Sequence, residues 1–238
     1  MQAIAAMHDD TDRPHVILNV AMSADGKLDT FERQGAKISS TLDAERVDCL
    51  RAESDAILVG GQTLLGDDPR LTVKSEALRA GRLARGLPEN PLKVGVVSKA
   101  ELKEESRFLV EGPARVIIFT TAQTDSAQLE FLRRRGVQVL VMGERRVDVI
   151  QALAELKRQG VRRLMVEGGG SLNAELLRLG LVDEIYIYIA PLIFGGVEAP
   201  TLADGAGLTR SRAIRLSLQS IDRLPEDGIL IHYLVNQD

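Results

Sequence analysis

The residues best suited to chemistry are a carboxylate followed by three glycines, Glu167 to Gly170. The apolar segment 163–166 precedes them and an amphipathic stretch opens at Ser171, so we expect a strand, a tight loop and a helix. Glycines let backbone N–H groups approach a ligand closely, and a helix N-terminus carries a partial positive charge. The pattern indicates a seat for a phosphate or pyrophosphate, with Glu167 at the carboxyl end of the strand, where α/β sheets bind ligands.

By itself this loop fits two interpretations. It lacks the third glycine of the dinucleotide fingerprint, because Asn173 stands at that position, and it occurs late in the chain rather than in the first strand–helix turn. A glycine-rich turn without a ligand would have the same sequence. The rest of the chain has to decide between a turn and an anion site.

A second stretch with similar chemistry follows the apolar segment 56–60, which has the composition of a buried parallel strand. Gly60 and Gly61 precede the hydroxyl of Thr63, and this arrangement indicates another backbone cradle for an anion. Two adjacent carboxylates, Asp67 and Asp68, come next. Paired carboxylates can bind a divalent metal, but no third ligand stands at a suitable spacing, so we expect them to bind hydroxyls or to cap the turn.

Four further side chains have a structural interpretation, and the first three also have a chemical one. Asp25 lies in a Ser-Ala-Asp-Gly turn, where it either serves the turn or marks the mouth of a site. Arg51 is either a solvated surface charge or an anion clamp, and Ser98 either holds a phosphate or caps a loop. Cys49 falls in a stretch with helical spacing, and we expect it to pack as a small hydrophobic residue.

The composition excludes several classes of function. A net charge of −4 and 3% aromatic residues, with no Trp, argue against nucleic-acid binding. One cysteine and three widely separated histidines exclude a disulfide framework and give no metal-ligand spacing. No apolar run is long enough to span a membrane, and the first residues lack the pattern of a signal peptide. We therefore expect a cytoplasmic protein with a flexible tail at residues 1–14.

The elements that must position these residues alternate along the chain. Strand and helix patterns follow one another to about residue 190, and two alternating segments around residues 225–228 then predict a β-hairpin. We expect one α/β domain over residues 15–238, with a mostly parallel central sheet of about nine strands, a C-terminal antiparallel hairpin and helices on both faces. Residues 75–92 interrupt this order, and we expect their arginines to form the solvated face of an exposed insertion.

The segment 184–190 and the Phe-Gly-Gly turn at 194–196 are unusually apolar for the edge of a domain. Exposed β edges are normally covered, so we predict a homodimer. The alternative is that helices of the same chain cover this edge.

Several separate motifs together resemble one family. They are NVAMSADGKL (19–28), RAESDAILVGGQTLLGDDPRLTV (51–73), VGVVSK (94–99), VEGGGSLNAELLRLGLVDEIYIYIAP (166–191) and the C-terminal hairpin. Over residues 15–236 the chain is similar to the reductases of the riboflavin pathway. The resemblance implies a dihydrofolate-reductase-like fold and an NADPH-dependent enzyme, without metal or flavin, that reduces the ribosyl group of a pyrimidine 5′-phosphate to ribityl. The zinc-deaminase motifs of bifunctional members are absent, which favours a stand-alone reductase that acts on 2,5-diamino-6-ribosylamino-4(3H)-pyrimidinone 5′-phosphate.

The resemblance also implies roles for individual residues. Positions that match cofactor contacts are Ala21, Thr63, Asp67, Ser98, Gly169, Gly170 and Ser171. Positions that match substrate contacts are Arg51, Leu71, Lys74 and Glu167, and Lys74 stands where bacterial members often carry arginine. Glu167 and Asp25 are the candidates for orienting the substrate or relaying a proton.

Other functions remain compatible with the sequence. A reductase of the deaminated 5-amino-6-ribosylaminouracil 5′-phosphate, or of another small heterocycle such as a pterin, fits the same scaffold. A non-catalytic nucleotide sensor would need the glycine loops but not Glu167, Arg51 and Lys74. NADH is an alternative to NADPH, because the discrimination depends on a few groups around the 2′-phosphate, for which Ser98-Lys99 is a candidate.

Overall fold

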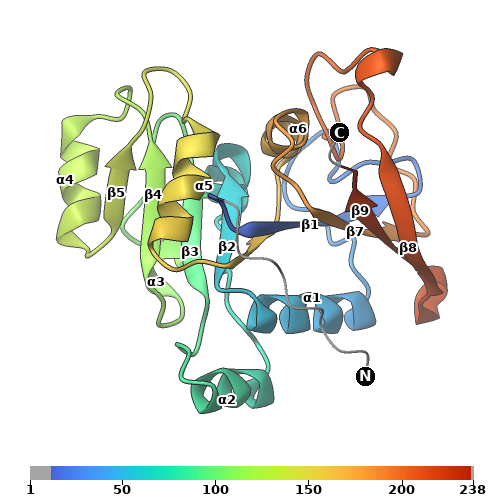
Figure 1. Cartoon of the computed structure of the whole chain (residues 1–238), viewed down its shortest axis with the longest axis horizontal. Helices are drawn as coiled ribbons and strands as arrows, with labels where there is room; N and C mark the ends of the chain where they lie inside the picture. The colour runs from blue at the N-terminus through green and yellow to red at the C-terminus, as the bar shows by residue number, and fades with distance from the viewer. Residues whose placement is uncertain (1–11, 237–238) are drawn as a thin grey trace.

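The computed structural model describes residues 12–236, so most of the tail expected at residues 1–14 lies outside the described residues. Its framework is one nine-stranded sheet with the strand order β5-β4-β3-β2-β6-β1-β7-β9-β8 (Figure 1). The strands are β1 (His15–Ser23), β2 (Ala56–Gly60), β3 (Leu92–Val96), β4 (Val116–Thr120), β5 (Gln138–Val141), β6 (Arg163–Val166), β7 (Glu184–Ala190), β8 (Leu216–Arg223) and β9 (Ile229–Val235). Neighbours from β5 through β7 pair in parallel, whereas β9 pairs antiparallel with β7 and β8.

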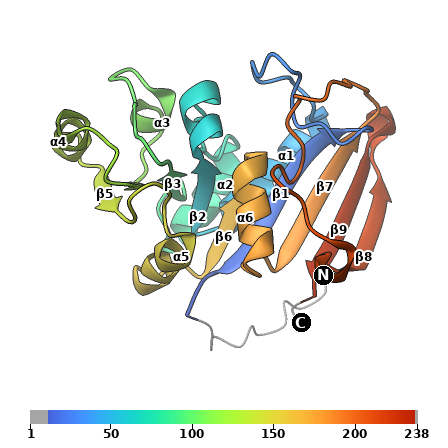
Figure 2. The same ribbon diagram turned by 90° about the horizontal axis from the view of Figure 1, so that it is seen from above.

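Helices cover both faces of this sheet (Figure 2). They are α1 (Thr41–Glu53), α2 (Glu76–Ala84), α3 (Arg107–Val110), α4 (Ser126–Arg134), α5 (Val149–Arg158) and α6 (Gly170–Arg178). On one face, strand residues such as Leu18 and Leu164 form a buried cluster with α5 and α6. On the other face, Ile57 and Met165 pack with residues of α1, α3 and α4. The expected α/β fold, with a mostly parallel sheet, an antiparallel end and helices on both faces, is confirmed.

Three local expectations were wrong. The apolar strand β7 is not an edge, because it lies between β1 and β9, and the edge on that side is β8. The arginine at the centre of the 75–92 segment is not solvated: Arg82 is 1% exposed and donates hydrogen bonds to the carbonyls of Ala52, Ser54 and Pro88. It therefore ties α2 to the end of α1. Cys49 is exposed, because α1 turns the neighbouring residues Asp48 and Leu50 inward instead.

A polar cluster joins β1, β7 and β9 around Glu184. The carboxylate hydrogen-bonds to the Nε2 atoms of His15 at 2.6 Å and His232 at 2.9 Å, and the ring of Tyr186 stacks on His232 with a centroid distance of 4.1 Å. The hydrogen bond with His15 is the largest influence on the pKa of Glu184; it outweighs burial and, with His232, lowers that pKa to about 2.

We expect Glu184→Gln to remove a pH-dependent part of the stability. A carboxylate with a lowered pKa stabilises the fold fully above its unfolded pKa near 4.5, and this contribution is lost as the pH falls toward 2. At pH 6 the variant should unfold about 2–3 kcal/mol more easily than the parent, and the difference should shrink below pH 4.5. Urea titrations from pH 3 to pH 7 measure this, with the exposed Glu130→Gln as control. A difference that stays constant with pH would contradict the assignment.

Among the described residues, no helix is long and apolar enough to cross a membrane. Within the same part of the chain, no group of three or more His, Cys, Asp or Glu side chains is arranged to hold a metal ion.

Candidate functional site

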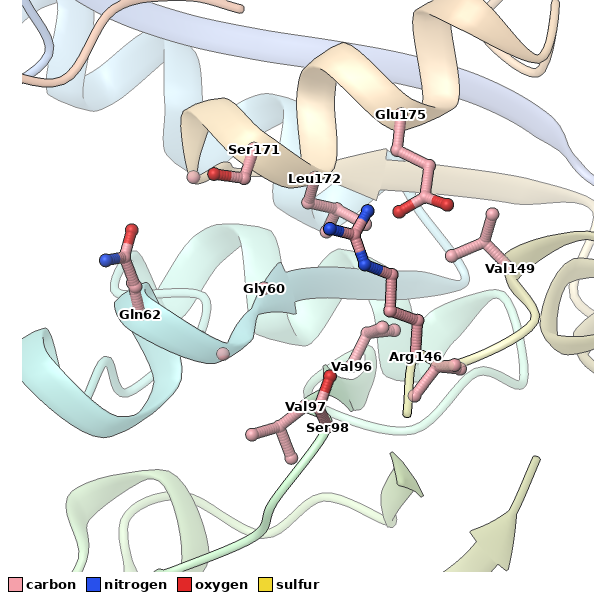
Figure 3. Close-up of a pocket in the computed structure, with 13 residues that line it drawn as sticks. Gly60, Gln62, Val96, Val97, Ser98, Arg146, Val149, Ser171, Leu172 and Glu175 are labelled. Carbon is pink, nitrogen blue, oxygen red and sulfur yellow. The ribbon is translucent and has the colours of Figure 1, made fainter. Parts of the chain in front are cut away.

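Two cavities open toward the carboxyl ends of the parallel strands and meet at Gly61, Gln62 and Gly169. The larger, of about 1030 Å³, is lined by β1, the 28–36 loop, the single turn Thr63–Asp67 (η1) and residues 167–170. The smaller, of about 260 Å³, lies between β2, the end of β3, the loop before α5 and the N-terminus of α6 (Figure 3). All the residues predicted to contact the cofactor line one of the two: Ala21, Thr63, Asp67, Gly169 and Gly170 the larger, and Ser98, Gly169 and Ser171 the smaller.

The glycine loop between β6 and α6 adopts a conformation that only glycine tolerates easily. Gly168 has a φ of 97°, and its carbonyl accepts a hydrogen bond from the amide of Gly60 at 2.7 Å, which joins the two glycine-rich stretches. Gly169 is the N-cap of α6 and offers no side chain to the helix. The amides of the first helical turn are therefore left for a ligand at the junction of the cavities.

Both glycine stretches allow a close approach that a larger residue would block. A Cβ on Gly169 would lie 3.3 Å from the hydroxyl of Thr63, and a Cβ on Gly61 would lie 3.1 Å from Val97. The arrangement suits a nicotinamide dinucleotide, because backbone amides at the junction of the two cavities could bind its pyrophosphate. The residues present are thus compatible with a nicotinamide cofactor, of which NADPH stays a prediction.

Glu167 follows β6 and forms a bidentate ion pair with Arg51 of α1. The Nε–Oε1 and Nη2–Oε2 distances are both 2.7 Å, and each side chain is 15% exposed. Burial lowers the pKa of Arg51, but the charge and hydrogen bonds of Glu167 outweigh it and raise that pKa. Arg51 also donates to the carbonyl of Thr72, so it links the floor of the larger cavity to the 68–75 segment. It is neither a solvated charge nor a free anion clamp.

Asp67 lies at the rim of the larger cavity, at the end of the η1 turn. Burial and the nearby charge of Asp29 raise its pKa, although Arg107 acts in the opposite direction. Asp29 accepts hydrogen bonds from the amides of Thr30, Gly35 and Ala36, and it thereby shapes the loop that forms one wall of the cavity. The adjacent Asp68 instead caps α3, where it binds the hydroxyl of Ser106.

Arg51 and three other predicted site residues lie outside the lining of both cavities. Asp25 is exposed, accepts hydrogen bonds from the Ser23 hydroxyl and the Gly195 amide, and has a lowered pKa, which favours its interpretation as a turn residue. Leu71 is buried in the core. Lys74 has an exposed side chain, while its amide is bound by Asp48. Of the predicted substrate contacts, only Glu167 lines a cavity.

The structure also adds residues that sequence reasoning missed. Asn19 and Asn173 both line the larger cavity, are at most 9% exposed, and each has an Oδ1 atom without a hydrogen-bond partner among the described residues. Buried acceptors of this kind are costly unless a ligand or water satisfies them. A signal existed for Asn19, which is the one polar residue within the apolar run 16–22 of β1.

Comparisons with known proteins show which proteins this chain is similar to. Residues 14–230 match the family model described as the RibD C-terminal domain. The chain is 42% identical over 214 residues to a protein of Archaeoglobus fulgidus named 2,5-diamino-6-ribosylamino-4(3H)-pyrimidinone 5′-phosphate reductase, a match that covers 90% of this chain and 95% of that protein. A protein of the same name from Methanothermobacter thermautotrophicus is also 42% identical, and the match covers 94% of this chain and 99% of that protein.

A solved structure supports the fold. A pyrimidine reductase-like protein from Corynebacterium diphtheriae superposes with a TM-score of 0.82 at 23% identity, over 94% of this chain and 93% of the other. At that identity the likeness concerns the fold alone.

Proposed function

Since the chain belongs to the family of RibD C-terminal domains, we propose that it is a stand-alone reductase that acts on 2,5-diamino-6-ribosylamino-4(3H)-pyrimidinone 5′-phosphate. The observation that carries this proposal is 42% identity, over nearly the whole length of both chains, to two proteins that bear that name. The reaction converts the ribosylamino group into a ribitylamino group. We propose NADPH as the reductant and residues 15–238 as a single reductase domain.

The chemistry needs a hydride at C1′ of the opened ribosyl chain. The ribosylamine opens to an imine with a C1′=N bond. NADPH, when bound, supplies the hydride to C1′, and one proton on the nitrogen completes the reduction of the imine to an amine. The task of the protein is to hold the two reactants in register and to exclude water. The larger cavity has room for the substrate beside a nicotinamide, and it contains Glu167 and Asp67.

Each proposed contact follows from a placement described above. The amides of Gly170 and Ser171 hold the pyrophosphate, and the hydroxyl of Thr63 helps to position the cofactor. Glu167, fixed by Arg51, orients the polar groups of the substrate. Leu71 and Lys74 act through the 68–75 segment, which Arg51 holds at Thr72.

Asp67 is better suited than Asp25 to carry a proton in this reaction. Burial and Asp29 raise the pKa of Asp67, whereas the hydrogen bond from Ser23 and the amides of the 194–195 turn lower the pKa of Asp25. A proton held on the Asp67 carboxyl would face the cavity in which the imine nitrogen must be protonated.

The experiment that tests the function is NADPH oxidation, followed by the loss of cofactor absorbance. The diamino substrate and its deaminated uracil counterpart are offered separately, with the product checked for a ribityl group by mass spectrometry. Turnover of the diamino compound supports the proposal. Preference for the deaminated compound would mean that deamination precedes reduction. Turnover of neither compound, together with tight NADPH binding, would contradict the proposal and favour a reductase of another heterocycle or a nucleotide sensor.

We also propose a homodimer, through β8 rather than through the strand that the sequence suggested. All of β8 is exposed, and its apolar side chains include Leu218 at 51% and Ile221 at 59% exposure. An exposed edge strand can pair with the same strand of a second copy around a twofold axis, which fits the self-complementary geometry of homodimers. The cytoplasmic location remains a prediction.

Light scattering of the purified chain tests the dimer. We expect twice the mass of one chain, and we expect the double variant Leu218→Glu/Ile221→Glu to have the mass of one chain. Val141→Glu, which places a glutamate at an exposed position of β5 on the opposite edge of the sheet, is the control and should stay dimeric. A monomeric parent, or a double variant that stays dimeric, would contradict the β8 interface.

A further inference from the structure

The loop between β5 and α5 brings an arginine to the smaller cavity from a part of the chain that no motif singled out. Arg146 lines this cavity, and its guanidinium extends toward α6 and Glu175 (Figure 3). The loop is anchored at both ends: the amide of Ala122 donates to the carbonyl of Gly143, and the amide of Asp148 donates to the carbonyl of Met142. The backbone of Arg146 is therefore held in place by its neighbours.

Gly143 allows the loop to turn tightly enough to place Arg146 at the cavity. Its φ is 105°, and a Cβ at that point would lie 2.2 Å from the carbonyl oxygen of Arg146. The turn thus folds back on itself more tightly than a residue with a side chain would allow.

The charges in this cavity are few and opposed. Among the described residues that line it, Arg146 carries the positive charge and Glu175 the negative one, while Gln62, Ser98 and Ser171 are neutral and polar. The lysine that the sequence suggested as a phosphate contact lies elsewhere. The side chain of Lys99 is 58% exposed, pairs with Glu101 and does not line the cavity.

We propose that Arg146 is the residue that makes this chain prefer NADPH over NADH, by binding the 2′-phosphate of the adenosine ribose, and that Glu175 opposes it. This rests on the proposed function, which puts the nicotinamide half beside Glu167 in the larger cavity. With the pyrophosphate at the junction near Gly169, the adenosine half then occupies the smaller cavity. A guanidinium matches the oxygens of a phosphate with two parallel hydrogen bonds.

Glu175 has the opposite effect on the two cofactors. Its carboxylate repels a 2′-phosphate, whereas it can accept a hydrogen bond from the 2′-hydroxyl of NADH, which is the role that acidic residues have in NAD sites. The preference of the chain is therefore a balance between Arg146 and Glu175, and each can be removed separately.

Binding measured without substrate tests the proposal. Calorimetric titrations compare NADPH with NADH, and 2′,5′-ADP with 5′-AMP, on the parent chain and on Arg146→Ala. We expect Arg146→Ala to weaken NADPH and 2′,5′-ADP about tenfold or more and to change NADH and 5′-AMP by less than about twofold. Glu175→Gln should tighten NADPH and weaken NADH. Arg145→Ala removes the same charge from an exposed neighbour that does not line the cavity, and it should leave both ratios unchanged.

The outcomes separate this inference from the proposed function. Equal weakening of both cofactors in Arg146→Ala, no change at all, or an equal effect of Arg145→Ala would overturn the role of Arg146 while leaving the reductase in place. A parent chain that binds both cofactors equally would overturn it as well. A parent chain that binds neither cofactor would instead remove the proposed function. Arg146→Lys keeps the positive charge but lacks the two parallel N–H donors of the guanidinium, so its affinity for NADPH should fall between those of the parent and the alanine variant.

Discussion

Gly170→Ala should destabilise the fold by about 3 kcal/mol, because the added methyl group meets backbone that cannot easily move. A Cβ at this position would lie 2.4 Å from the carbonyl oxygen of Thr201 and 2.5 Å from a carboxylate oxygen of Asp204. These two residues hold each other, since Asp204 accepts hydrogen bonds from the amide and hydroxyl of Thr201, and the amide of Asp204 donates to Gly170 itself. The 199–204 segment thus packs directly on the start of α6.

Thermal unfolding followed by circular dichroism measures this effect. For a chain of this size, about 3 kcal/mol corresponds to a fall of roughly 6–12 °C in Tm. We also expect weaker NADPH binding, because the same residue shapes the anion seat. Gly81→Ala is the matched control: it lies in α2 with no atom near its added Cβ, so alanine should leave the Tm unchanged or raise it. A Tm of Gly170→Ala close to that of the parent would mean that the 199–204 segment can move aside.

The sequence predicted the strands and the glycine loops well because these features are local. Apolar runs such as 56–60 and a glycine run before an amphipathic helix are visible within a short window. The parallel order of the strands then brings their carboxyl ends to one edge of the sheet, so loops far apart in sequence, such as those at Gly61 and Gly169, meet in space.

Features that depend on distant partners could not be predicted in this way. The pairing of Arg51 with Glu167 joins residues 116 positions apart, and neither residue shows it in its own surroundings. The burial of Arg82 depends on carbonyls at the end of another helix. Arg146 follows a glutamate and another arginine on an exposed loop, where a solvated charge is the ordinary expectation. The edge strand was misplaced because β9 pairs with β7, a long-range contact that composition does not record.

Glu167→Gln should lower kcat by about a hundredfold with a smaller effect on stability. The carboxylate binds Arg51 through two hydrogen bonds of 2.7 Å, and an amide can accept only one of them. The side chain would then rotate or shift, and a misplacement of about 1 Å costs on the order of a hundredfold in rate. Stopped-flow measurement of NADPH oxidation gives the rate, and urea unfolding gives the stability of the same samples.

A double-mutant cycle with Arg51→Gln decides whether the pair acts as one unit. If Arg51 works by holding Glu167 in place, each single variant loses most of the activity and the double variant is no slower than the worse of the two. The pair Arg79–Glu89, with an N–O distance of 2.7 Å on the more exposed α2 side, supplies the control, and Glu89→Gln should change kcat by less than about twofold. Losses that multiply in the double variant would show instead that Arg51 and Glu167 contact the substrate independently. In that case Arg51 would have to leave its bond to Glu167 when substrate binds, and the substrate phosphate would be the partner strong enough to draw it away.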